Sequence, residues 1–165
     1  MVIKAWNDAL ASGYLDGKSK YIWDDFLEAY HWMMNQMKNK LPRYDGEYPI
    51  WVWVKRPDLR LSAHLKRGEV GVLLELNLDE KDVLFSDFMA WHIVLANEFL
   101  SLCEEEDKQY ELGQSAISKE ESWERIFAYK ELKKFDYWKG EEDIQGVTGK
   151  VSINNIKHIK TFKAR

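Results

Sequence analysis

Cysteine, proline and glycine are scarce in this chain of 165 residues. A single cysteine, Cys103, excludes an internal disulfide framework and any zinc site built from several cysteines, and it is typical of a reducing compartment. Only 3 prolines and 9 glycines accompany 45% hydrophobic residues, which excludes collagen-like and low-complexity chains. The length suits one hydrophobic core, so we expect a single domain over residues 1–165.

The sequence also lacks an excess of basic residues and a long apolar run. Lys and Arg number 24 against 28 Asp and Glu, and the net charge of -4 gives no general attraction to nucleic acid or anionic lipid. Lys4, Asn7 and Asp8 interrupt the first apolar residues, unlike a signal peptide, and no apolar stretch is long enough to cross a bilayer. We therefore expect a cytoplasmic protein that binds neither nucleic acid nor membranes.

The motifs of several large enzyme classes are missing. None of the patterns GxxxxGK[ST], GxGxxG, GxSxG, HExxH and CxxC occurs, which disfavours P-loop enzymes, dinucleotide folds, serine hydrolases and zinc proteases. The four histidines, at positions 31, 64, 92 and 158, are too far apart in the sequence for a paired metal-ligand motif. We therefore expect no metal site.

Aromatic residues are abundant, with 8 Trp, 8 Tyr and 7 Phe spread along the whole chain, so we expect an aromatic core. Apolar residues at helical spacing predict a helix over residues 23–41, ended by Pro42, after a shorter helix over residues 3–14. Runs of β-branched and aromatic residues predict strands over residues 48–54, 70–78, 144–147 and 151–153. The basic residues 157–165 are interpreted as a solvated face of a helix or strand.

The middle of the chain predicts a buried helix over residues 88–100, because its apolar residues occupy nearly every face. Ser86 and Asp87 can cap its first turn. His92 is expected to be buried or half-buried, since it falls on the apolar stripe of Phe88, Trp91, Leu95 and Phe99.

The polar residues 103–118 predict a solvated loop that includes the acidic run 104–107. The capping box Ser118 and Glu121 then opens a helix that reaches residue 132. The fold class that follows is α+β, with a small mixed or antiparallel sheet, N-terminal helices and a buried central helix.

The connection between the first two strands, residues 55–68, is too long for a simple hairpin, and long ordered loops often carry function. Guanidinium groups make bidentate contacts with phosphate, and a flanking tryptophan can stack on a base, so we predict a ligand site at Trp51, Trp53, Arg56, Arg60, Ser62 and His64. The alternatives are a solvated basic loop and tryptophans that only pack in the core.

A second polar group, Ser86, Asp87 and His92, could face the same cleft. The alternative is a helix cap together with a core histidine that is hydrogen-bonded to the backbone.

Several stretches carry a resemblance to a known family. They are Tyr48-Pro49-Ile50-Trp51-Val52-Trp53 and residues 56–60, 84–88, 91–92, 122–127, 144–145 and 159–165. Together they resemble the bacterial domain-of-unknown-function family 3841 over nearly the whole chain. This resemblance implies no particular activity.

The order of elements also resembles that of ADP-ribosyltransferase-type domains, on the segments 13–15, 83–87 and 153–159. In those domains a late strand carries a catalytic glutamate, and the resemblance places Gln145 at that position and implies NAD as a cofactor. A neutral amide can hydrogen-bond a ribose hydroxyl, but it lacks the charge that stabilises an oxocarbenium-like centre.

Two functions follow as hypotheses. The first is binding of a small nucleotide-like or phosphate-bearing ligand in a basic, aromatic-lined cleft, on an ADP-ribosyltransferase-like scaffold. The alternative is a non-enzymatic interaction module, such as a phage or mobile-element inhibitor of a host protein, which uses exposed aromatic residues and the acidic residues 104–107. A surface patch of tryptophans favours the second hypothesis, and a hollow lined by Arg56, Arg60 and His64 favours the first.

Overall fold

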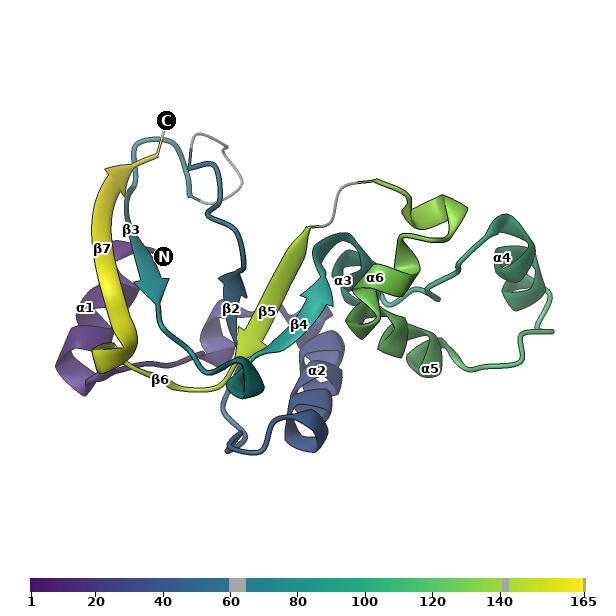
Figure 1. Cartoon of the computed structure of the whole chain (residues 1–165), viewed down its shortest axis with the longest axis horizontal. Coiled ribbons are helices and arrows are strands. Elements are labelled where there is room, and N and C mark those ends of the chain that lie inside the picture. The colour runs from purple at the N-terminus through teal and green to yellow at the C-terminus, as the bar shows by residue number, and fades with distance from the viewer. Residues whose placement is uncertain (60–64, 141–142, 165) are drawn as a thin grey trace.

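Strands from opposite ends of the chain pair in antiparallel fashion. The computed structural model describes residues 1–59, 65–140 and 143–164 (Figure 1). Its strands form three small sheets. In the first, β1 (Tyr14–Leu15) pairs with β6 (Val151–Ser152), and in the second, β5 (Ile144–Thr148) lies between β2 (Ile50–Trp53) and β4 (Leu84–Asp87). The third pairs β3 (Val70–Leu76) with β7 (Ile156–Lys163). Since helices and antiparallel strands alternate irregularly, the predicted α+β fold is confirmed.

The predicted strands are confirmed, although several of them are shorter than expected. In β3 the side chain of Val72 is buried, whereas Val70 at the start of the strand is 43% exposed. A register shift between Glu75 and Leu76 ends the regular pairing with β7. The basic segment near the end of the chain, which the sequence left open between helix and strand, is the strand β7.

The first two helices end where the sequence predicts. Helix α1 (Ile3–Ser12) ends at Gly13, whose φ of 78° is left-handed and favours glycine. Helix α2 (Leu27–Lys40) ends before Leu41, which is extended because Pro42 follows it. The start of α2 differs from the prediction, because Asp24–Phe26 form a 3-10 turn and Trp23 is 73% exposed.

Helix α3 (Phe88–Leu95) is the predicted buried helix, and Ala90, Trp91 and Val94 on it are buried. The side chain of Asp87 caps it by accepting a hydrogen bond from the backbone N–H of Ala90 at 2.9 Å. The prediction that this helix reaches residue 100 is wrong. Asn97 adopts a left-handed φ of 60°, so the buried ring of Phe99 lies beyond the end of the helix.

The predicted loop at residues 103–118 is also wrong, because it contains helix α4 (Glu104–Glu111). Its acidic run fills the first turn, where negative charge interacts favourably with the helix dipole. The capping box of Ser118 and Glu121 is confirmed at the start of α5 (Lys119–Trp123). The predicted continuous helix is broken, however, into α5, the 3-10 helix Glu124–Phe127 and α6 (Tyr129–Leu132). Shorter 3-10 turns lie at Ser19–Tyr21, Glu80–Asp82, Asp136–Trp138 and Ile153–Asn155.

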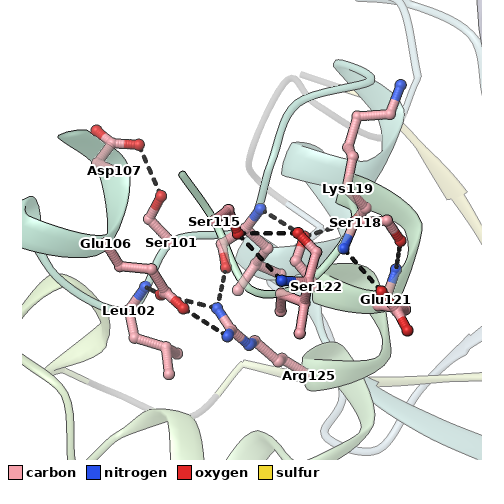
Figure 2. A network of polar contacts seen from close by, with 12 residues as sticks. Ser101, Leu102, Glu106, Asp107, Ser115, Ser118, Lys119, Glu121, Ser122 and Arg125 are labelled. Atoms are coloured by element: carbon pink, nitrogen blue, oxygen red, sulfur yellow. Dashed lines mark hydrogen bonds and ion pairs between the residues drawn. The ribbon is translucent and has the colours of Figure 1, made fainter. Parts of the chain in front are cut away.

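A polar network holds α4 against the following 3-10 helix (Figure 2). The guanidinium of Arg125 donates to both carboxylate oxygens of Glu106, at 2.6 and 2.8 Å, and to the carbonyl oxygen of Leu100 at 2.6 Å. Glu106 also accepts from the backbone N–H of Leu102, and Asp107 accepts from the hydroxyl of Ser101. All four acidic residues of the run therefore have partners within the protein, since Glu104 pairs with Lys108 and Glu105 accepts from Gln109 inside α4.

Two separate groups of buried apolar residues hold the elements together. The larger core joins α2, α3, α5 and β5, and its buried residues are Ala29, Met33, Met37, Leu41, Ala90, Trp91, Val94, Leu100, Trp123, Ile126, Leu132 and Val147. The smaller core lies between α1 and the β3–β7 sheet, and its buried residues are Trp6, Ala9, Leu15, Val72 and Val151. Figure 1 shows α1, β3 and β7 at the left end and α4, α5 and α6 at the right, with the three-stranded sheet between them. Within the described part of the chain, every helix is too short or too polar to traverse a bilayer.

Candidate functional site

A hollow lined by aromatic residues opens beside the three-stranded sheet. Its volume is about 220 Å³, and α2, β2, α3 and β5 supply its walls, with Tyr30, Trp51, Trp53, Phe88, Trp91 and Gln145 among the lining residues. We call it the aromatic hollow. The pairing of β2 with β5 brings together the lining residues from the early and the late part of the chain (Figure 1).

Strand register fixes which side chains face this hollow. In β5, Gln145 lies opposite Trp53 of β2 on one side and opposite Ser86 of β4 on the other. Residues directly opposite one another in antiparallel strands project from the same face, so these three side chains form one row. Trp51 projects from the same face two positions earlier and lies opposite Val147, which belongs to the larger core. The same sheet face therefore changes from core packing at Trp51 to an open hollow at Trp53.

The rings around the hollow contact one another. Trp51 lies against Trp91 with ring centroids 4.7 Å apart, and Trp53 lies against Phe88 at 4.8 Å. The ring of Tyr30 makes T-shaped contacts with both Trp51 and Trp91. Because Trp53 is 40% exposed, one wall of the hollow is open to solvent. The prediction that Trp51 and Trp53 flank a ligand site stays a prediction, and both of them line this hollow.

Gln145 supplies a polar group in the apolar hollow. Its side chain is 4% exposed, and its amide nitrogen has no hydrogen-bond partner among the described residues. The hydroxyl of the neighbouring Ser86 is also buried and has no hydrogen-bond partner among the described residues. A buried donor left unpaired costs about 1–3 kcal/mol. The Gln145 amide is therefore a buried donor that the described residues leave unsatisfied.

The Tyr30 hydroxyl and the Trp51 indole nitrogen are two further polar groups of the aromatic hollow. Burial raises the pKa of the Tyr30 hydroxyl, and the nearby indole N–H of Trp51 opposes this shift. The indole nitrogen is buried and makes no hydrogen bond of good geometry to the described residues. At neutral pH the Tyr30 hydroxyl is therefore protonated and can both donate and accept a hydrogen bond.

His92 lies at the edge of the aromatic hollow and is exposed, so the prediction that it is buried or half-buried is wrong. Helix α3 turns this side chain outward, where its ring meets Phe88 edge-on with centroids 4.5 Å apart. Its Nδ1 lies 2.9 Å from the carbonyl oxygen of Phe88, as expected for a histidine bonded to the backbone. Since that oxygen can only accept, Nδ1 carries the proton, and Nε2 of the neutral ring is free to accept.

Asp87 has a structural role, because both of its carboxylate oxygens make contacts within the protein. One of its carboxylate oxygens caps α3, and the other pairs with the ammonium of Lys133 at 2.8 Å, while the side chain is 1% exposed. It is not among the residues that line the aromatic hollow. The structure therefore separates Asp87 from His92 and supports the helix-cap interpretation for it.

A second hollow, of about 650 Å³, lies beside the end of β7. It is lined by Arg56, Asp58, Lys160, Phe162, Lys163 and Ala164, among others, and we call it the basic hollow. Arg56 therefore lines a different hollow from Trp51 and Trp53. We predicted one basic cleft with aromatic walls, but the structure distributes these three residues over two hollows. Arg60, Ser62 and His64 lie outside the described residues, so their predicted convergence with Arg56 stays a prediction.

Sequence reasoning missed Lys160 and Lys163 as site residues. Residues 157–165 were interpreted only as a solvated face, whereas β7 pairs with β3 and brings these lysines beside the segment that follows β2. Ile156, Ile159 and Phe162 recur every third residue, so this segment lacks the period of two that identifies a strand in a sequence. Within the described ranges, His, Cys, Asp and Glu side chains form no group of three that could hold a metal ion.

Comparison with known families gives a match over most of the chain. The model of the domain of unknown function DUF3841 matches residues 3–120. This chain belongs to that family. No curated protein and no solved structure matches it. The resemblance to ADP-ribosyltransferase-type domains is therefore not confirmed.

The part matched by the DUF3841 family contains α1 to α4 and β1 to β4, with Trp51, Trp53, Arg56 and the residues 86–92. Gln145, Lys160 and Lys163 follow it in the chain. Each hollow of this DUF3841 protein therefore combines residues from the matched part with residues beyond it.

Proposed function

We propose that this domain binds a nucleotide-like ligand, with the planar base of the ligand in the aromatic hollow. The unpaired amide nitrogen of Gln145, buried in a hollow with aromatic walls, carries the proposal. Nucleobases present π faces that stack on Trp, Tyr and Phe, and their ring nitrogens and carbonyl oxygens accept hydrogen bonds. An acceptor on the base would satisfy the Gln145 amide.

The size of the aromatic hollow limits what enters it. At about 220 Å³ it is smaller than the roughly 300–1,000 Å³ of pockets that hold drug-sized ligands. It therefore suits one planar ring system, and the sugar and phosphate of a nucleotide would lie outside. None of its lining residues carries a formal charge when His92 is neutral, so phosphate binding has to come from elsewhere.

NAD is the cofactor to test first, because the resemblance to ADP-ribosyltransferase-type domains places Gln145 at the position of their catalytic glutamate. The proposal is binding with little turnover, since an amide does not supply the negative charge that a glutamate places near the reacting ribose. Glu75 is not a substitute, because it lies on β3 and does not line the aromatic hollow. Glu141, which is close to Gln145 in the sequence, lies outside the described residues. We place the protein in the cytoplasm, where NAD and nucleotides are available to it.

The first experiment measures nucleotide binding to wild-type protein and to Gln145→Leu by calorimetry and tryptophan fluorescence. AMP, ATP and NAD are the ligands, and ribose 5-phosphate is the control that lacks a base. We expect Gln145→Leu to weaken binding about tenfold, because the base loses its donor. The exposed Gln114→Leu is the matched control and should bind like wild type.

The same variant distinguishes a ligand-binding role of Gln145 from a structural role. Gln145→Leu removes a buried amide that lacks a partner, so we expect the free energy of unfolding to stay the same or to increase by about 1 kcal/mol. A large loss of stability together with unchanged affinity would contradict the proposal. So would equal binding of ribose 5-phosphate and AMP.

A second candidate function, binding to another protein, is favoured by one observation. Trp23 is 73% exposed and stacks on Phe26 with ring centroids 5.7 Å apart, and Tyr21 close by in the chain is 56% exposed. The acidic residues 104–107 give weaker support, since Glu106 and Asp107 are bound within the protein. A photo-crosslinking residue at position 23, compared with one at the exposed Leu112, tests this candidate in cells. One discrete adduct at position 23 alone would support it, and equal labelling at both positions would not.

A further inference from the structure

The basic hollow combines side chains from two distant parts of the chain. Arg56 belongs to the segment after β2, and Lys160 and Lys163 belong to β7. Within residues 1–59, 65–140 and 143–164, none of these three cations forms an ion pair with a carboxylate. Three cations without such partners therefore surround one hollow.

The framework of the basic hollow is held in place by β3. Phe162 lies opposite Gly71 in the register of the β3–β7 sheet. A Cβ atom at Gly71 would lie 2.8 Å from the Phe162 ring and 2.3 Å from Leu65, so a larger residue would displace these two side chains. Ala164 then forms backbone hydrogen bonds with Gly68 and Glu69, both at 2.9 Å, which fix the end of β7. Phe162 and Ala164 therefore give the hollow an ordered wall.

The charge of the basic hollow is opposite to that of the whole protein. Its lining residues carry three positive charges and the one negative charge of Asp58, a balance of +2, in a chain of net charge -4. An arginine fork makes bidentate contacts with phosphate oxygens, and lysines act as point charges towards the same groups. With about 650 Å³ against about 220 Å³, the basic hollow also has nearly three times the volume of the aromatic hollow.

We infer that the basic hollow binds linked phosphate groups, such as a diphosphate or triphosphate, through Arg56, Lys160 and Lys163. The volume and the three cations favour linked groups over a single phosphate. The chemistry is shared by inorganic oligophosphate and by the phosphate tail of a nucleoside triphosphate. This site does not depend on base binding in the aromatic hollow, so either proposal can fail alone.

The test is calorimetric titration of the full chain with inorganic tripolyphosphate, inorganic phosphate and ATP at low and moderate salt. We expect tripolyphosphate to bind at least tenfold more tightly than phosphate, with an affinity that falls as salt screens the charges. The double variant Lys160→Gln/Lys163→Gln should weaken tripolyphosphate binding at least tenfold. Arg56→Lys keeps the charge but loses the fork, so we expect a several-fold loss.

The matched control is Lys157→Gln, which removes an exposed charge from β7 that does not line the basic hollow. It should leave the affinity unchanged. An equal loss in this control would show general charge attraction and overturn the inference, as would no binding of tripolyphosphate by wild type. Gln145→Leu should leave tripolyphosphate binding intact whether or not base binding exists, which keeps the two proposals distinguishable. Tighter binding of ATP than of tripolyphosphate would identify a nucleotide as the source of the phosphates, and equal binding would identify inorganic oligophosphate.

Discussion

The larger and the smaller core differ in what fills them and in what is built on them. The larger core packs residues of α2, α3, α5 and α6 against β5 and includes Trp91 and Trp123, with further rings around it. The smaller core has α1 on one side of the β3–β7 sheet, with Trp6 as its one buried aromatic residue among those described. The aromatic hollow lies on the first and the basic hollow on the sheet of the second. Because local stability follows buried apolar contacts, the two candidate sites have supports of unequal stability.

The largest effect is expected for Trp123→Ala in the larger core. The Trp123 side chain is 1% exposed, and its indole N–H donates to the carbonyl oxygen of Glu98 at 2.6 Å. Its removal leaves a cavity and an unpaired carbonyl, so we expect a loss of about 3–5 kcal/mol in the free energy of unfolding. Urea denaturation measures it. Trp23→Ala, at a 73% exposed position, is the control and should cost less than about 0.5 kcal/mol.

The same substitution in the smaller core, Trp6→Ala, should cost about 3 kcal/mol, at the lower end of the range. Trp6 is 9% exposed and has few buried neighbours, so the site can collapse more readily. We expect hydrogen exchange to show lost protection in β3 and β7 while α2 and α3 keep theirs. If both tryptophan variants lower protection equally throughout the chain, the two cores are one cooperative unit and the comparison fails.

A smaller effect is expected at the polar network that accompanies the larger core. Among the described residues, no ion pair joins α1 to the β3–β7 sheet, whereas Arg125 and Glu106 are joined by a bidentate, half-buried pair. Arg125→Met removes the guanidinium that Glu106 and the Leu100 carbonyl accept from, and Glu106 keeps only the Leu102 N–H, so we expect a loss of about 2 kcal/mol. The matched control is Lys108→Met, which removes the exposed pair with Glu104 and should cost less than about 0.5 kcal/mol. Equal costs in thermal or urea unfolding would remove the distinction.

The smallest effect is a pH dependence located at Glu106. Burial alone would raise the pKa of Glu106, but hydrogen bonds from Arg125 and from the Leu102 backbone N–H, with the Arg125 charge, hold it below its ordinary value of 4.5. A depressed pKa contributes stability that is present above pH 4.5 and is lost as the pH falls through the folded-state pKa. Glu106→Gln should flatten this acid limb in urea unfolding measured between about pH 3 and 6. An acid limb identical to that of wild type would show that other carboxyl groups are responsible.

Local signals in the sequence predicted the ends of several elements correctly. Gly13, Pro42, Asp87 and the box of Ser118 and Glu121 act on the residues beside them, so their effect can be read without knowing the fold. The end of α3 and the presence of α4 were missed for a different reason. An apolar run does not show that Asn97 turns left-handed, and an acidic run is typical both of a loop and of the first turn of a helix.

The candidate site was less predictable, because it depends on pairing between distant strands. The sequence grouped Arg56 with Trp51 and Trp53 since they are neighbours in the chain, but the fold places the arginine beside β7 and the tryptophans beside β5. Lys160 and Lys163 become visible as site residues only when β7 is known to pair with β3. Gln145 was singled out by a resemblance, and only the register shows that it lies in one row with Trp53 and Ser86.

The pairing of late strands with early ones also sets the order in which this protein can fold during synthesis. Each of the three sheets needs β5, β6 or β7, so a nascent chain that ends at residue 120 holds strand sequences but none of their partners. The 57 positions from Asp87 to Ile144 take roughly 3–11 s to translate at about 5–20 residues per second. During that interval the apolar strand Ile50–Trp53 has no β5 to cover its edge, which leaves it open to pairing with other chains.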